Sequence, residues 1–203
     1  MYFKKLIITL LVVVSVQLTS QNYTQYIRPM IGTGGHGHTF PGPTYPFGMV
    51  QLSPDTRIDG SWDGCSGYHY DDSIIYGFSH THLSGTGCSD YGDFSFMPYF
   101  SDQDNFLDYN RLYENGVRFS HKNEVAKAGY YSVVIDNGVK VELTTTERVG
   151  ITQYTAPKDG FVLVLLHLKH RDQLLEGKIN QVNAINFNGK RVSKAWAARQ
   201  ELY

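Results

Sequence analysis

The chain has 203 residues, the length of one large domain, and carries 18 lysines and arginines against 19 aspartates and glutamates, a formal net charge of −1. This balance excludes the basic surface that nucleic-acid-binding domains need, and no block of like charge indicates a tail or a membrane-surface patch. Two widely separated cysteines also exclude a zinc knuckle.

The N-terminus predicts a signal peptide over residues 1–20. Lys4 and Lys5 precede an apolar run from Leu6 to Val16, and polar residues follow. A basic segment before a short apolar run is typical of secretory signals, and this run is too short to span a bilayer comfortably. We therefore expect an exported protein, periplasmic or secreted, with no membrane contact after signal removal and a single domain over residues 21–203.

Export would place Cys65 and Cys88 in a compartment that permits disulfides. A bridge between them would join two glycine-rich loops. The alternative is a pair of free thiols packed among small residues. We favour the bridge.

The first half of the chain predicts short strands between long loops. Three prolines between His36 and Pro46 exclude a helix interior or a central strand there. Pro98 is expected to push its own strand towards a sheet edge. The expected strands are Phe47–Leu52, Tyr68–Tyr70, Ile74–Phe78 and Phe94–Phe100.

The second half predicts strands more clearly, because β-branched and aromatic runs alternate with turn signals. Asn137-Gly138 indicates a hairpin, and Asn188-Gly189 a second turn. Short helices are expected at Asn105–Glu114 and Glu124–Lys127. The fold class is therefore all-β and mainly antiparallel, a β-sandwich with long Gly-rich loops and a few short helices. The expected strands are Arg118–His121, Tyr130–Ile135, Val139–Thr146, Arg148–Tyr154, Phe161–His167, Ile179–Val182 and Ala184–Phe187.

The candidate site is the loop-rich stretch from Ile31 to Pro98, because function tends to lie on loops held by a rigid scaffold. His80 and His82 would point to one face of a strand and could bind a transition metal with a third ligand from His36, His38 or Asp90. Alternatively, these histidines hydrogen-bond a polyhydroxylated ligand or brace the loops. We favour this second interpretation and predict no metal site.

Trp62 lies in a Gly/Ser/Asp loop, where an indole is expected to be an exposed platform for the apolar face of a sugar ring. The alternative is an aromatic residue that fixes the loop. Glycoside hydrolysis needs two carboxyl groups, one of them protonated, and the sequence offers no persuasive pair. Nearby aspartates could bind sugar hydroxyls or simply form turns: Asp55, Asp59, Asp63, Asp90 and Asp93.

Several long motifs, in order along the whole mature chain, resemble the N-terminal domain of glycoside hydrolase family 92. They include IGTGGHGHTFPGP from Ile31 and GFSHTHLSGTG from Gly77. The others are Pro46–Asp55, Phe119–Tyr131, Val141–Gly150 and Ser193–Ala197.

The resemblance implies an exported, inverting, calcium-dependent exo-α-mannosidase acting on N-glycans or mannans. In that family a β-sandwich precedes an (α/α)6-barrel domain, which supplies the catalytic acid and base and most Ca2+ contacts. We expect this chain to end before that domain and before the sandwich itself is complete, to contain no catalytic residue and to be inactive alone.

The resemblance also implies that the sandwich loops form part of the sugar pocket. Trp62 matches a tryptophan that binds the sugar next to the cleaved mannose in α-1,2-specific members, so we favour α-1,2 linkages. One alternative is a stand-alone carbohydrate-binding module, and a weaker one is a metal-dependent sandwich enzyme using His80 and His82. The predicted substrate-binding residues are Trp62, Gly34, Gly35, His80, His82, Asp55 and Tyr68.

Overall fold

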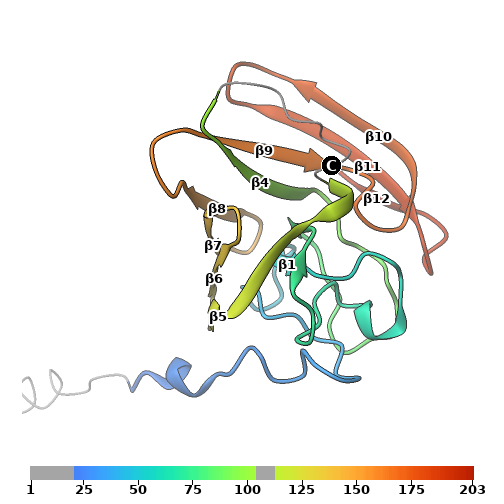
Figure 1. Cartoon of the computed structure of the whole chain (residues 1–203). Coiled ribbons are helices and arrows are strands. Elements are labelled where there is room, and N and C mark those ends of the chain that lie inside the picture. The colour runs from blue at the N-terminus through green and yellow to red at the C-terminus, as the bar shows by residue number, and fades with distance from the viewer. Residues whose placement is uncertain (1–20, 104–112) are drawn as a thin grey trace, which may run out of the picture.

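The computed structural model describes residues 21–103 and 113–203, so the predicted signal peptide lies outside the described residues. So does most of the predicted helix Asn105–Glu114, of which residues 113 and 114 are described and helical. The described chain forms three antiparallel sheets (Figure 1). Two short 3-10 helices accompany them, η1 (Tyr23–Tyr26) and η2 (Trp62–Gly64). None of the described helices has the length and apolar character to cross a membrane.

The first sheet has four strands in the order β1-β3-β4-β9. Strand β4 lies between β3 and β9, yet β3 pairs with it only at Phe96. Pro98 therefore lies where β4 has a single strand neighbour, and its carbonyl accepts a hydrogen bond from Asn137 Nδ2 at 3.0 Å. The prediction that Pro98 pushes its strand to a sheet edge is therefore wrong, because β4 is an inner strand that merely lacks a second neighbour at this residue. The strands are β1 (Ser53–Asp55), β3 (Gly77–Ser79), β4 (Ser95–Ser101) and β9 (Phe161–His167).

The second sheet has five strands in the order β2-β5-β6-β7-β8. Asn137 and Gly138 form the tight connection between β6 and β7, as expected, with Gly138 at φ +89°. The predicted helix Glu124–Lys127 is wrong: these residues end β5, which pairs with β6 after a register shift between Phe119 and Glu124. The strands are β2 (Ile74–Ile75), β5 (Val117–Lys127), β6 (Tyr130–Ile135), β7 (Lys140–Thr145) and β8 (Gly150–Thr155).

The third sheet is a hairpin of β10 (Gln173–Gln181) and β11 (Phe187–Lys194), to which β12 (Gln200–Leu202) adds. The predicted turn at Asn188-Gly189 is wrong. The chain turns at residues 182–186, where Val182 N donates to Asn186 O at 2.8 Å, and Asn188 pairs with Asn180 inside the hairpin. The signal misled because Asn-Gly is also compatible with a strand when another loop closes the hairpin.

The hydrophobic core lies between the first two sheets. Side chains alternate along a strand, so one face of β6 and β7 supplies Tyr131, Val133, Val141 and Leu143 to it. Opposite them lie Phe78, Met97 and Tyr99 from the first sheet. Figure 1 shows the resulting layers, with β4 and β9 above β5–β8 and the β10–β12 sheet beyond them. The predicted β-sandwich is confirmed.

Two predicted strands of the first half are instead loop. Residues 47–50 are not strand, and Gln51 makes an isolated bridge with Thr44. Phe47 has φ +61° and a fully exposed ring, which its apolar character did not indicate. Residues 68–70 are likewise outside any strand. Both segments belong to the loops that cover one end of the sandwich.

A buried ionic network fixes these loops to the sheets. Asp55, on β1, has no exposed surface. Its Oδ1 lies 3.0 Å from His82 Nε2 and its Oδ2 lies 2.8 Å from His170 Nε2. Burial by itself raises the pKa of Asp55, but the charges and hydrogen bonds of His82 and His170 outweigh that effect and hold the pKa well below its usual range. Asp55 is therefore an ionised structural anchor.

A second buried carboxylate, Asp93, attaches the third sheet. Arg191 of β11 has no exposed side-chain surface and pairs through Nη1 with Asp93 Oδ1. The other oxygen, Asp93 Oδ2, accepts from Thr81 Oγ1 at 2.7 Å and from Gln200 Nε2 at 2.9 Å. The contact with Thr81 closes the central loop (residues 80–94) on itself, and the contacts with Arg191 and Gln200 join this loop to β11 and β12.

We predict that Asp55→Asn lowers the free energy of unfolding by about 3 kcal/mol at pH 7, because it removes one partner of a buried ionic group. The lowered pKa of Asp55 means that its contribution is present above its unfolded-state pKa of about 3.9 and is lost as the pH falls through the folded-state pKa. Urea unfolding of both proteins between pH 7 and pH 3 measures the difference.

The difference should remain constant down to about pH 5 and shrink below about pH 4. Asp71→Asn serves as the matched control, because the Asp71 side chain is 76% exposed and lies 3.9 Å from His69 Nδ1. A constant gap across the whole pH range, or an equal loss for Asp71→Asn, would show that the charge of Asp55 does not stabilise the fold.

Candidate functional site

Trp62 begins η2 and presents its indole at the surface, where 63% of the residue is exposed. The edge of its ring meets the imidazole of His38, with 5.1 Å between ring centroids and 79° between planes. On another side the ring covers Gly87. A Cβ added to Gly87 would lie 2.2 Å from Trp62 Cη2, so only glycine permits this close approach. The indole is therefore exposed but held in a defined orientation.

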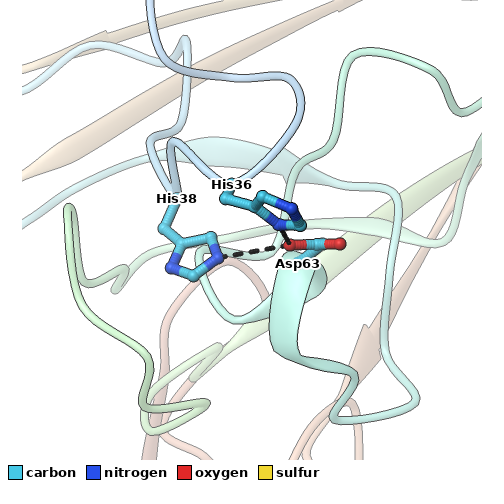
Figure 2. A group of neighbouring side chains, drawn as sticks. All are labelled: His36, His38 and Asp63. Carbon is cyan, nitrogen blue, oxygen red and sulfur yellow. Dashed lines mark hydrogen bonds and ion pairs between the residues drawn. The ribbon is translucent and has the colours of Figure 1, made fainter.

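Beside Trp62, two histidines from one loop and an aspartate from η2 converge (Figure 2). His36 Nδ1 lies 2.6 Å from Asp63 Oδ1, and His38 Nε2 lies 3.4 Å from the same oxygen. These contacts, led by the hydrogen bond from His36, lower the pKa of Asp63. The group combines the exposed imidazole of His36, the buried imidazole of His38 and the partly exposed, ionised carboxylate of Asp63.

His38 has a strained backbone with φ +53°, which is uncommon for a residue other than glycine. Two contacts hold it there: Gly85 N donates to His38 O at 2.6 Å, and His38 Nδ1 lies 2.7 Å from Thr86 O. Its neighbour Gly37 packs so tightly that an added Cβ would lie 2.2 Å from Gly32 O. Strain of this kind concentrates at functional sites, so the loop geometry marks His38 as a positioned side chain.

The predicted glycines Gly34 and Gly35 lie in the loop that leads to His36. Gly35 is exposed with φ +56°, and its carbonyl lies 3.1 Å from His69 Nε2. Gly34 is half-buried. Gly34, Gly35 and Trp62 are thus predicted substrate-binding residues that have solvent-exposed surface on these loops.

Three other predicted binding residues are buried and bonded within the fold. Asp55 and His82 belong to the ionic network, where His82 Nδ1 also lies 2.7 Å from Gln51 O. The Tyr68 hydroxyl donates to the buried Glu124 at 3.0 Å, and burial, with Glu124 second, raises the pKa of Tyr68. These side chains have no exposed surface for a sugar, and their observed contacts hold the loops together.

His80 and His82 do not share a ligand face, because β3 ends at Ser79 and both histidines follow it. His80 is half-buried, with Nδ1 3.0 Å from Phe94 O, and burial lowers its pKa. His82 turns instead towards Asp55. The residues that do converge are His36, His38 and Asp63. The sequence signal for them was the His-Gly-His spacing, but nothing in the sequence pointed to Asp63 as their partner.

The predicted Cys65–Cys88 bridge is absent, because both cysteines are free thiols in the structure. The Cys65 thiol is buried and donates to Thr86 O at 2.7 Å. Burial raises the pKa of Cys65. The two loops are therefore joined here by hydrogen bonds and packing.

Asp172 is an acid that the sequence did not single out. Burial raises the pKa of Asp172 to about 6, and the positive charges of Arg171 and Arg191 only partly oppose this. Ser89 Oγ donates to Asp172 Oδ1 at 3.4 Å, which ties it to the central loop. A single carboxyl group provides only half of the pair that glycoside hydrolysis needs.

The cluster of His36, His38 and Asp63 does not fit the Ca2+ that the resemblance to glycoside hydrolase family 92 implies. Calcium takes six to eight oxygen ligands, whereas His36 and His38 offer nitrogen and Asp63 offers one carboxylate. In the part of the chain that the structure describes, three or more His, Cys, Asp or Glu side chains bring their ligand atoms close enough for one ion at His36, His38 and Asp63. The surface can instead offer an aromatic face, hydrogen-bonding imidazoles and a carboxylate, a set that suits a polyhydroxylated ligand.

The sequence profile of the glycosyl hydrolase family 92 N-terminal domain matches residues 26–203. A curated relative, an uncharacterized secreted glycosidase from Arthroderma benhamiae, is 30% identical over 141 residues, which make up 67% of this chain and 18% of that protein. This chain thus spans about a fifth of that relative.

Two solved structures from Bacteroides thetaiotaomicron are similar. One is a family GH92 α-mannosidase solved with mannoimidazole, with a TM-score of 0.78 and 33% identity over 89% of this chain and 24% of its own. The other is a GH92 inverting mannosidase, with a TM-score of 0.59 and 31% identity over 72% of this chain and 20% of its own. The profile covers most of the chain and the fold is shared, so this chain belongs to glycosyl hydrolase family 92 and matches the N-terminal domain of that family.

Proposed function

We propose that the chain is the N-terminal part of an exported, inverting, calcium-dependent exo-α-mannosidase that acts on N-glycan or mannan mannosides, with a preference for α-1,2 linkages. Similarity to a secreted glycosidase and to two mannosidases supports the export and the substrate class. In this proposal the loop surface around Trp62 forms one wall of the sugar site.

The exposed indole of Trp62 is the observation that carries the proposal. An apolar ring held in place by His38 and Gly87 loses little freedom when a sugar stacks on it. Asp63 and His36, beside it, are suited to hydrogen bonds with sugar hydroxyls. Gly34 and Gly35 contribute backbone groups at the same surface.

The proposal assigns the general acid and base to a following barrel domain. The carboxylate nearest to Trp62, Asp63, has a lowered pKa because of its histidine contacts and is thus unsuited to protonate a leaving group. Asp55 is ionised and buried. Calcium, when bound by the full enzyme, would supply an electrophile for sugar hydroxyls, and this chain's residues position the sugar ring.

A stand-alone carbohydrate-binding module is the second candidate. The same observation favours it, because Trp62 offers a sugar-binding face without a catalytic pair around it. The two candidates differ in whether a catalytic domain continues the chain.

A side-by-side assay of the full-length protein and the 203-residue chain tests the proposal. We expect the full-length protein to release mannose from α-1,2-mannobiose faster than from the α-1,3 and α-1,6 isomers, with inversion seen by NMR and with calcium required. The chain alone should release none. Hydrolysis by the chain alone, or no mannosidase activity of the full-length protein, would refute it, and mannose binding without any encoded catalytic domain would favour the binding module.

We predict that Trp62→Ala raises the KM of the full-length protein for α-1,2-mannobiose about fivefold, since the loss of one stacking contact costs about 1 kcal/mol. Trp62→Phe should retain most of the affinity, because it keeps an aromatic face. Phe187→Ala, which removes a similarly exposed ring (59%) at the start of β11, should leave KM unchanged. An unchanged KM for Trp62→Ala would exclude the platform role.

We predict that Gly87→Ala raises KM to a similar extent, because the added methyl group displaces the indole without removing it. The thermal midpoint should change little, since Trp62 is exposed. In the Trp62→Ala background the Gly87→Ala change should have no further effect on KM. An additive effect in the double variant would show that Gly87 contributes independently of Trp62.

A further inference from the structure

We propose that His36, His38 and Asp63 form a binding site for a zinc(II) ion at the surface of the loop cluster. The three ligand atoms all lie within 4.8 Å of one another. Two imidazoles and one carboxylate leave coordination positions open, as in zinc sites that keep water or another ligand in place. The inference does not depend on the proposed mannosidase function.

The hydrogen bonds of His38 leave its Nε2 available to a metal ion. His38 Nδ1 lies 2.7 Å from Thr86 O, and a carbonyl oxygen can only accept, so Nδ1 carries the proton and donates. In the neutral ring, Nε2 then carries a lone pair, and it faces Asp63 Oδ1 at 3.4 Å. With both lone pairs directed at each other, a cation between His38 Nε2 and Asp63 Oδ1, either a second proton on His38 or a metal ion, would remove their repulsion.

The same hydrogen bond is typical of metal-binding histidines. Such histidines usually donate their second ring N–H to a carboxylate or a backbone carbonyl, which fixes both tautomer and ring orientation. Thr86 O has this position relative to His38, and the edge contact with Trp62 restricts the ring further. The strained backbone of His38 shows that the loop holds this side chain where an unstrained loop would not.

The geometry already approaches that of a zinc site. Tetrahedral zinc with bonds of about 2.1 Å separates its ligand atoms by about 3.4 Å, the distance observed between His38 Nε2 and Asp63 Oδ1. His36 Nδ1 lies closer to that oxygen, at 2.6 Å, because they share a hydrogen bond. A zinc ion would require His36 Nδ1 to move away from Asp63 Oδ1 by somewhat less than about 1 Å. The His36 side chain is 81% exposed, so this movement disturbs no packed neighbours.

The donor set selects the kind of metal. Imidazole nitrogen suits zinc and its neighbours in the transition series, whereas calcium and magnesium prefer oxygen. The Asp63 carboxylate adds an oxygen ligand of a kind that zinc also accepts. We therefore expect the site to discriminate strongly against Ca2+.

Calorimetric titration of the purified chain, prepared without a histidine tag, with ZnCl2 tests the proposal. We expect one zinc ion per chain, and CaCl2 in excess should not displace it. NMR of the imidazole protons should show zinc-dependent shifts at His36 and His38 but not at His82. His36→Ala and Asp63→Asn should each weaken zinc binding at least about tenfold, the scale of loss when a metal site is damaged.

Asp71→Asn is the matched control, because it also removes an exposed carboxylate beside a histidine and should leave zinc affinity unchanged. His36 and Asp63 are both surface residues, so circular dichroism should confirm that their variants remain folded. The proposal is overturned if zinc fails to bind, if it binds the two variants as tightly as the unaltered chain, or if NMR shows a doubly protonated His38 that zinc does not affect.

Discussion

Two aspartates without exposed surface, Asp55 and Asp93, hold the loops of this domain to its sheets. A buried carboxylate is unfavourable unless charged or hydrogen-bonding partners surround it. Here those partners come from distant segments: His170 follows β9, and Arg191 belongs to β11. The Asp93 network is therefore complete only when the third sheet is in place, because Arg191 and Gln200 belong to β11 and β12. His170, in the connection between β9 and β10, completes the Asp55 network.

These two networks explain how long glycine-rich loops can keep a defined surface. Arg171, next to His170, donates through Nη2 to Cys65 O at 2.8 Å and so fixes the end of η2 from beneath. Trp62, at the other end of η2, can then be exposed without being mobile in orientation, since Gly87 and His38 support its ring. The loops can hold the candidate site in a defined shape because the buried ion pairs of Asp55 and Asp93 attach them to the rest of the fold.

The strands of the second half could be predicted from sequence, because Tyr130–Ile135 and Phe161–His167 have the alternation and the β-branched content that a sandwich needs. The loop contacts could not. Asp55 and His170 are 115 residues apart, and Asp93 and Arg191 are 98 apart. The local sequence pattern does not show which distant residues pair. The burial of Asp55, Tyr68 and His82 could therefore not be predicted, and these residues were expected to bind substrate. Glu124–Lys127 resembled a helix because propensity ignores that Glu124 accepts hydrogen bonds from Tyr68 and Tyr131.

The two His-x-His pairs show why residue type alone does not define a site. His80 and His82 follow β3 into the interior, where a main-chain carbonyl meets Nδ1 of each and Asp55 meets Nε2 of His82. His36 and His38 lie on a loop whose glycines let it fold tightly, and there Thr86 O occupies only one nitrogen of His38. The other nitrogen faces Asp63 at the surface, beside the exposed indole. In both His38 and His82 one ring nitrogen meets a main-chain carbonyl and the other faces a carboxylate. The two differ in access, because the Asp55 side chain that faces His82 is fully buried, whereas the Asp63 side chain that faces His38 is 32% exposed.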